Sequence, residues 1–276
     1  MTVRDMEIGV MLGVGEDPMA GVKKVADLGV TCCQMGSPAD EYLVSPGREK
    51  VKKALETYGI TVTTVFVGFP GESYTDVETV KQTVGYLRRD TRAARIARTY
   101  KVSDFARFLG VERVASHIGF IPEDTSDPRY GEMVQAVRDI VSHCARNGQV
   151  FALETGQEPA EVLLRFIKDV GGLQLRVNFD PANMILYGSG EPLPALALLA
   201  NYVDGVHVKD GDWPTAPGKL GQEKPLGQGK VNIPAYVAKL KELGYKGPLT
   251  IEREITGPEQ VADLKKAIKM LEKLRV

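Results

Sequence analysis

The sequence predicts an α/β protein in which eight β-α units close into a single barrel. Short β-rich segments alternate with helical patterns along the whole chain, which indicates a parallel sheet. The most distinctive polar residues fall at the ends of the last four segments, where the strands of a barrel converge. The predicted strands cover residues 7–12, 31–36, 60–67, 113–119, 149–155, 175–180, 203–210 and 248–254. Because 276 residues with 43% apolar content suit one large core, we expect a single domain over residues 1–276.

The helices between these strands are predicted from apolar periodicity. Val22, Val25 and Leu28 share one face of the first helix, and Leu264 and Leu271 share one face of the last. Glycines stand where five of the helices should end: Gly29, Gly59, Gly110, Gly148 and Gly244. An open doubly wound sheet is the alternative fold. It is weakened because no glycine-rich turn of the dinucleotide-binding type follows the first strand.

Composition excludes several classes of partner. The 35 basic and 36 acidic side chains nearly cancel, and no long run of like charge suggests a nucleic-acid arm or a membrane-surface helix. No window approaches 18 apolar residues, and no charged leader precedes an apolar stretch. We therefore expect a cytoplasmic protein with no nucleic-acid or membrane partner. Cys32, Cys33 and Cys144 form neither a disulfide framework nor a zinc knuckle, so they are expected to be buried as small apolar residues.

Two connections are longer than a β-α loop requires. Residues 68–90 follow the third predicted strand and carry Phe69, Tyr74 and Tyr86, and residues 211–230 follow the seventh. Because both segments leave the carboxyl end of a strand, both should overhang the mouth of the barrel. Long loops in that position are usually lids or binding loops.

Four candidate metal ligands stand at the ends of four consecutive predicted strands: Glu154, Asp180, His207 and Glu252. Three carboxylates and one imidazole are the ligands of a mononuclear divalent metal, with positions left open for a substrate. Taken alone, either glutamate could instead be the partner of a nearby Arg or Lys. Their coincidence with an aspartate and a histidine on the two intervening strands favours the metal site.

Further polar residues surround these ligands. His117 ends the fourth predicted strand and could contact the substrate or orient a ligand. Six other residues are expected to bind substrate oxygens: Gln157, Glu158, Asn183, Lys209, Asp210 and Lys224. The glycines of the segment PLGQGKV (225–231) give a weak phosphate signal, because the Gly-Lys-Ser/Thr signature of a nucleotide loop is absent.

Blocks of sequence that contain these residues resemble the sugar phosphate isomerase/epimerase superfamily, the xylose isomerase-like TIM barrels. The resemblance covers nearly the whole chain and is carried by HIGFIPED, LETGQE, NFDPANMILYG, HVKDGDWP, PLGQGKV and GPLTIERE. In ketose 3-epimerases of this group, a divalent metal is bound by the equivalents of Glu154, Asp180, His207 and Glu252. The resemblance therefore implies one divalent ion, commonly manganese, with magnesium, cobalt or zinc as alternatives.

The same resemblance implies a reaction. In the ketose 3-epimerases, the equivalents of Glu154 and Glu252 are also an acid/base pair on opposite faces of the substrate, acting through an enediolate. By analogy, this chain is expected to be a metal-dependent isomerase or epimerase of a small sugar, ketose or keto-polyol, with Glu154 and Glu252 as catalytic residues. Those epimerases usually carry a histidine where this chain has Asn183, and an amide cannot shuttle protons as imidazole can.

The departure at Asn183 leaves the particular reaction open. One alternative is a dehydratase or lyase that acts on a keto-inositol or a 3-keto sugar, and a second is a sugar-binding barrel without catalysis. Apurinic endonucleases share the barrel, but their three-zinc site needs more histidines than the three present here. The oligomeric state is open, with a homo-oligomer among the alternatives.

Overall fold

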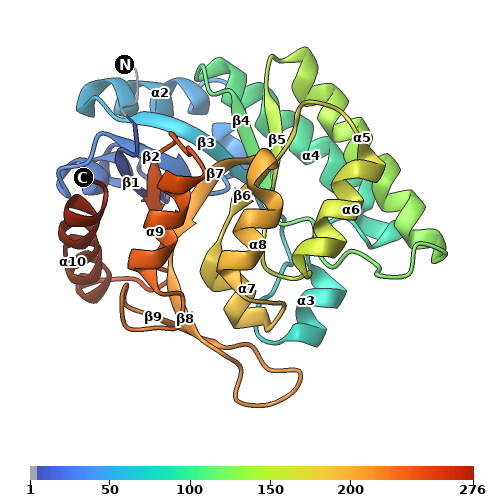
Figure 1. Cartoon of the computed structure of the whole chain (residues 1–276). Coiled ribbons are helices and arrows are strands. Elements are labelled where there is room, and N and C mark those ends of the chain that lie inside the picture. Colours follow the sequence, from blue (N-terminus) through green and yellow to red (C-terminus); the bar gives the residue numbers. More distant parts are fainter. Residues whose placement is uncertain (1–4) are drawn as a thin grey trace.

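The computed structural model describes residues 5–276 and shows one closed barrel of parallel strands surrounded by helices (Figure 1). Neighbouring strands follow the order β1-β10-β7-β6-β5-β4-β3-β2 around the ring. This confirms the predicted single (β/α)8 TIM barrel. The barrel strands are β1 (Ile8–Leu12), β2 (Cys32–Met35), β3 (Thr61–Val67), β4 (Arg113–Ser116), β5 (Val150–Glu154), β6 (Leu175–Phe179), β7 (Val203–Val208) and β10 (Leu249–Ile251).

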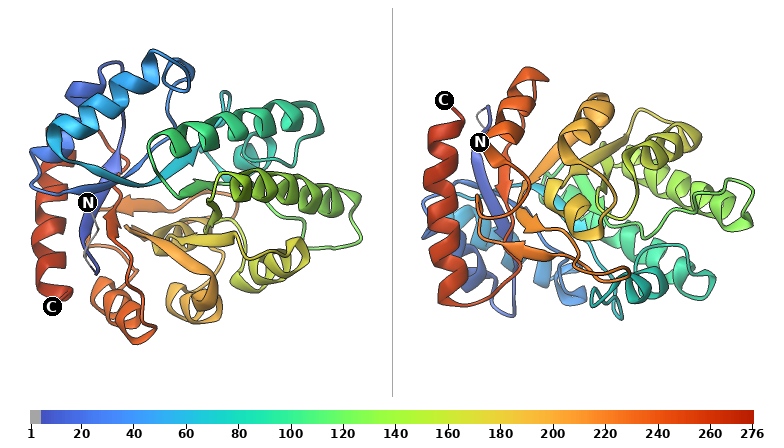
Figure 2. Two further views of the ribbon diagram at one scale, coloured as in Figure 1. Left: turned by 90° about the horizontal axis from the view of Figure 1, so that it is seen from above. Right: turned by 60° about the horizontal axis from the view of Figure 1, so that its bottom comes forward.

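Helices coat the outside of the ring, as the view from above shows (Figure 2). They are α1 (Pro18–Ala26), α2 (Gly47–Tyr58), α3 (Val77–Thr83), α4 (Arg89–Phe108), α5 (Pro128–Arg146), α6 (Ala160–Val170), α7 (Pro181–Tyr187), α8 (Pro192–Leu199), α9 (Ile233–Glu242) and α10 (Pro258–Leu274). The short 3₁₀ turns η1 (Asp40–Tyr42) and η2 (Ala200–Tyr202) lie between them. The five glycines predicted to end helices all have positive φ, between 65° and 80°, as left-handed helix ends require. Within the described residues, no helix combines the length and apolar character needed to span a bilayer.

Strand alternation divides the protein into an apolar coat and a more polar barrel interior. In β5, Phe151 and Leu153 belong to the large core between the strands and the helices, whereas Ala152 belongs to a small separate cluster. In β7, Val206 and Val208 face that same large core. Because successive side chains of a strand point to opposite faces, Glu154 and His207 point into the barrel interior.

All eight predicted strands are shorter in the structure, and the fourth, the seventh and the eighth lose the most at their carboxyl ends; the eighth ends at Ile251 instead of residue 254. The fourth ends at Ser116 instead of residue 119, because the chain there leaves the barrel to meet the 68–90 segment. Tyr86 N donates to Ile118 O at 3.0 Å, and an added Cβ on Gly119 would lie 2.3 Å from Val84 O. The seventh ends at Val208, after which Asp210–Asp212 (β8) pairs with Gln222–Lys224 (β9) in an antiparallel hairpin.

The two long connections meet at the mouth of the barrel. The 68–90 segment contains α3, and the 211–230 segment contains most of the β8-β9 hairpin with its long loop. Val77 N donates to Gly218 O at 3.2 Å, so the two segments are in direct contact. Glu72 ties the first segment together, because its carboxylate accepts from Phe69 N at 3.0 Å and Gly85 N at 2.9 Å. Both segments line the cavity at the mouth, as the sequence predicts.

Candidate metal centre

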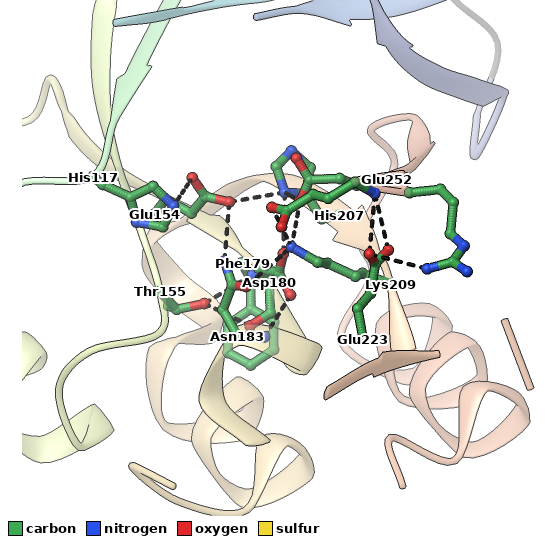
Figure 3. A network of polar contacts seen from close by, with 12 residues as sticks. His117, Glu154, Thr155, Phe179, Asp180, Asn183, His207, Lys209, Glu223 and Glu252 are labelled. Atoms are coloured by element: carbon green, nitrogen blue, oxygen red, sulfur yellow. Dashed lines mark hydrogen bonds and ion pairs between the residues drawn. The ribbon is translucent and has the colours of Figure 1, made fainter. Parts of the chain in front are cut away.

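Glu154, Asp180, His207 and Glu252 converge on one point at the carboxyl end of the barrel (Figure 3). One ligand atom from each side chain lies within 4.8 Å of the ligand atoms of the other three. Nδ1 of His207 is 2.9 Å from Glu154 Oε1 and 3.3 Å from both Asp180 Oδ2 and Glu252 Oε2. Three carboxylates at the carboxyl ends of β5, β6 and β10 thus lie around one nitrogen from β7.

Asp180 is held by the start of α7. Its Oδ1 accepts from Asn183 N at 2.9 Å, so the side chain is the N-cap of that helix and Oδ2 remains directed at His207. Its backbone N–H donates to Thr155 Oγ1 at 2.8 Å, which ties the end of β6 to the end of β5. The helix cap therefore fixes the direction of one carboxylate oxygen of the site.

His207 is fully buried, and side chains from strands β2 and β3 across the barrel fix the orientation of its ring. Its Nε2 lies 2.9 Å from Oε1 of Gln34, and its ring stacks on Phe66 with 5.3 Å between centroids. Sequence reasoning did not single out Gln34. A polar residue within the otherwise apolar run CCQM of the second strand is the signal that could have found it.

Glu154 has a titratable partner just past the end of the neighbouring strand β4. His117 Nε2 lies 2.9 Å from Glu154 Oε2, and Asn183 Nδ2 donates to Glu154 Oε1 at 3.4 Å. Burial raises the pKa of the Glu154 carboxyl, but the charges and hydrogen bonds of His117 and His207 outweigh it and hold the pKa below its ordinary value. For His117, burial lowers the pKa, but the charge of Glu154 raises it to about 9.

Glu252 has a lysine partner instead. Nζ of Lys209 lies 3.0 Å from Glu252 Oε2, 2.7 Å from Glu254 Oε1 and 3.2 Å from Asn183 Oδ1. This lysine is 1% exposed. Burial opposes ionisation of Glu252, but Lys209 and His207 hold the pKa of that carboxyl well below its ordinary value. Besides His207, which both glutamates share, Glu154 therefore has the imidazole of His117 as its neighbour and Glu252 has the ammonium of Lys209.

The donor set fits a divalent cation. Three carboxylates and a neutral imidazole carry a formal charge of about −3, which a dication reduces to about −1. Burial lowers the pKa of His207, yet Glu252 and Glu154 raise it well above its ordinary value, so the field at the centre strongly favours positive charge. Oxygen ligands with one imidazole suit manganese, magnesium, cobalt or zinc.

The other predicted site residues are distributed unevenly. His117 and Asn183 line the mouth cavity, which has a volume of about 1080 Å³. Gln157 contacts His117, with 3.1 Å between Nε2 and Nδ1. Lys224 is not among the residues that line this cavity, and its Nζ lies 2.9 Å from Gln222 Oε1 and 3.5 Å from Asp212 Oδ2.

Asp210 is buried and its carboxylate is occupied by backbone donors. Oδ1 accepts from Gly211 N at 2.9 Å and from Val231 N at 3.1 Å, and Oδ2 accepts from Gly227 N and Gly229 N, both at 2.9 Å. The glycine-rich segment that gave the phosphate signal does bind an anion with its N–H groups. That anion is Asp210 of the same chain.

Glu158 is buried beside the site and carries a prediction about stability. Burial raises the pKa of this carboxyl from 4.5 to about 7, although a hydrogen bond from Ile121 N opposes the rise. Between these two pKa values the folded protein holds a proton that the unfolded chain has lost, so stability falls as pH rises through the window. Glutamine cannot ionise. We expect the unfolding free energy of Glu158→Gln, relative to wild type, to increase by roughly 3 kcal/mol from about pH 4.5 to about pH 7.

Urea unfolding of both proteins at several pH values measures this difference. A difference between variant and wild type that stays constant across the window would contradict the raised pKa of Glu158.

Comparison with known proteins places the barrel in a family. The family model described as Xylose isomerase-like TIM barrel matches residues 22–274. The crystal structure of a xylose isomerase domain protein from Planctomyces limnophilus is 42% identical, has a TM-score of 0.94 and is matched over 98% of both chains. A D-tagatose 3-epimerase-like protein, 20% identical with a TM-score of 0.77 over 98% of both chains, shares the fold.

Among curated proteins, an uncharacterized protein from Methanocaldococcus jannaschii is 28% identical over 160 residues, which make up 53% of this chain and 52% of that protein. The match therefore spans about half the length of that relative. The family match, in contrast, extends over most of the present chain. The protein belongs to the xylose isomerase-like TIM barrel family.

Proposed function

We propose that this protein is a divalent-metal-dependent isomerase or epimerase of a small ketose or keto-polyol. The observation that carries the proposal is the convergence of Glu154 and Glu252 on His207 Nδ1 from strands β5 and β10, which β6 and β7 separate in the ring. A barrel that bound a sugar without catalysis would need these side chains only as ligands of the metal. Two glutamates that line the same cavity, on opposite sides of the metal ligands Asp180 and His207 in the ring, also supply two groups able to take or give a proton.

The roles of the chain's own residues follow from their neighbours. When bound, a divalent cation supplies Lewis-acid polarisation of a carbonyl and a neighbouring hydroxyl. One glutamate takes the proton from the carbon next to the carbonyl, and the other returns a proton to the opposite face. The glutamate that takes the proton from carbon starts ionised, and the glutamate that returns a proton first receives it from its cationic neighbour, His117 for Glu154 or Lys209 for Glu252. Asn183 touches Glu154 and Lys209 and can only donate or accept hydrogen bonds.

The cavity supports a small polar substrate. Acidic and amide groups lie at its base, and Phe66, Tyr74 and Tyr187 contribute aromatic surface to its lining. At about 1080 Å³, including the open part of the mouth, the cavity is large enough for a monosaccharide or an inositol. Manganese remains the proposed metal, and magnesium, cobalt and zinc are the alternatives.

Elimination of water is the second candidate reaction, and His117 favours it. Its imidazole lies 2.9 Å from Glu154, whose charge raises the pKa of His117 and favours the protonated form. A dehydratase needs a base that takes a carbon-bound proton and an acid that gives a proton to the departing hydroxyl, which leaves as water. Glu252 and His117 could divide these two roles on a keto-inositol or a 3-keto sugar.

One experiment separates these alternatives. The manganese-loaded protein is incubated in deuterated water with a panel of ketoses, keto-inositols and 3-keto glycosides, and products are analysed by NMR and mass spectrometry. An isomerase or epimerase should place deuterium on carbon without a change in oxygen content, whereas a dehydratase should yield a product lighter by one water. Binding of a panel member without either change would favour the non-catalytic alternative.

Tyr74 carries a prediction about the rim of the cavity. It is 43% exposed, lines the mouth, and its ring centroid lies 5.7 Å from that of His117. An aromatic contact of this kind contributes about 0.5–1.5 kcal/mol, so Tyr74→Ala should lower kcat/KM by up to about tenfold and leave metal affinity unchanged. Steady-state kinetics and metal titration measure the two effects.

Tyr100→Ala is the matched control for Tyr74→Ala. Tyr100 also contacts a histidine, stacking on His143 at 4.2 Å, but it lies on α4 outside the barrel and does not line the mouth. Full activity is expected for this variant. If the two alanine variants behaved alike, the rim would have no part in turnover.

A further inference from the structure

Gln34 reaches the metal centre across the interior of the barrel. It lies on β2, whose neighbours in the ring are β1 and β3, whereas His207 lies on β7 between β10 and β6. The 2.9 Å contact between Gln34 Oε1 and His207 Nε2 therefore crosses the barrel and is not a contact between adjacent strands. Gln34 is 1% exposed and His207 is fully buried, so water does not compete freely for this bond.

A second amide fixes the orientation of Gln34. Its Nε2 donates to Asn178 Oδ1 on β6 at 3.0 Å, which is again a contact across the interior. Gly205 leaves room for this arrangement, because an added Cβ at that position would lie 2.5 Å from Asn178 Oδ1 and 3.5 Å from Gln34 Nε2. Turning the Gln34 amide alone would set its oxygen against Asn178 Oδ1, so that two acceptors would face each other.

These contacts define which nitrogen of His207 carries the proton in a metal complex. An amide oxygen is only an acceptor, so Nε2 must be the protonated nitrogen. The lone pair of a neutral imidazole then lies on Nδ1, the atom that faces the three carboxylates. We propose that Gln34 is a positioning residue, which holds the His207 ring and selects the tautomer that presents Nδ1 to the divalent ion. The inference rests on the metal site of the proposed function.

Metal affinity tests the proposal without any substrate. Outer partners of metal-binding histidines contribute about 10–100-fold to affinity, so Gln34→Met, which keeps the length and removes the acceptor, should weaken Zn²⁺ binding by about that factor. Gln34→Glu keeps an acceptor oxygen, and the Nδ2 of Asn178, which has no hydrogen-bond partner among the described residues, could then donate to it. Zn²⁺ affinity of Gln34→Glu should match or exceed that of the wild type.

Gln149→Met is the matched control. Gln149 is also buried, but it bonds Ser103 and Val111 outside the metal centre. Its loss should lower thermal stability and leave Zn²⁺ affinity unchanged. The proposal would be overturned if folded Gln34→Met bound Zn²⁺ within about threefold of wild type, or if it lost no more affinity than the control.

A spectroscopic measurement addresses the tautomer directly. The chain has three histidines, so ¹⁵N-histidine NMR of the Zn²⁺-loaded protein gives few signals, and His117→Gln and His143→Gln assign the remaining set. We expect a slowly exchanging proton on Nε2 of His207 in the wild type and in Gln34→Glu, but not in Gln34→Met. A proton on Nδ1 in the loaded wild type would overturn the proposal, and so would an unprotected Nε2.

The outcome is separable from that of the proposed function. Affinity and tautomer are both measured on the metal complex, so a positive result stands even if no panel substrate is turned over. Conversely, an active enzyme whose Gln34→Met variant keeps both its metal affinity and its Nε2 proton would refute the role of Gln34 and leave the proposed function intact.

Discussion

Glu154→Gln and Glu252→Gln should each lower turnover by at least about 10²–10⁴-fold while the barrel stays folded, because a positioned acid or base supplies about that factor. Glutamine keeps one oxygen for the metal but cannot accept a proton. We therefore expect each variant to bind the metal more weakly and still to be saturable with it. If the protein is an epimerase with two bases, one variant should still exchange the carbon-bound proton in one stereochemical series only.

Glu254→Gln is the control on the same segment of chain as Glu252. Glu254 also bonds Lys209, at 2.7 Å, but its side chain is 61% exposed and it is not one of the four candidate metal ligands. The buried Lys209 keeps Glu252 and Asn183 as partners and Glu254 itself is exposed, so loss of this pair should change stability by about 1 kcal/mol or less and leave most of the activity. If both glutamine variants of the site stayed within about tenfold of wild type, the acid/base assignment would fail even with the metal site established.

Removal of the divalent ion should produce the second large effect. A ligand that binds only the folded state at a free concentration about 1,000 times its Kd stabilises that state by about 4 kcal/mol. We expect chelation to abolish turnover and to lower Tm markedly, with full recovery on adding manganese. His207→Ala should remove the metal-dependent part of Tm altogether, because the only nitrogen among the four candidate ligands is lost.

His143→Ala is the matched control for His207→Ala. His143 pairs with Asp104 at 2.9 Å on the outer helices and is not one of the candidate ligands, so its loss should leave the metal-dependent shift in Tm intact. An unchanged shift in His207→Ala, measured by differential scanning calorimetry with and without chelator, would show that the ion binds elsewhere.

The barrel and the four converging residues could be predicted from the sequence, because both depend on patterns within short stretches of the chain. Alternating apolar segments predict strands, and a polar residue directly after an apolar strand predicts a position at the barrel mouth. The parallel connections of a barrel then bring Glu154, Asp180, His207 and Glu252 together without any detailed knowledge of packing. The strand ends of β4 and β7 were less predictable, because contacts with distant loops decide where they stop.

The supporting contacts depend on pairs of residues that are remote in sequence. Gln34 and His207 are 173 positions apart, and nothing in the local sequence of either residue identifies the other. Lys224 and Asp210 follow the seventh strand, as predicted for substrate contacts, but the β8-β9 hairpin and the 225–231 segment provide nearby partners for both side chains. Local pattern shows that a polar side chain is near the mouth, but not which hydrogen bonds it has already formed.

The Asp210 carboxylate has a consequence for how the β9-α9 connection can change during evolution. Three backbone N–H groups of the segment, those of Gly227, Gly229 and Val231, share this one side chain, so the path of residues 227–231 depends on a single codon outside the segment. Gly229 has no room for a Cβ, which would lie 2.3 Å from Asp210 Oδ1, and Gly227 has a φ of +83°. Gln228, between these two glycines, is exposed, and its backbone N–H bonds Pro225 O. The residue type at position 228 can therefore change during evolution while the backbone path of residues 227–231 stays the same.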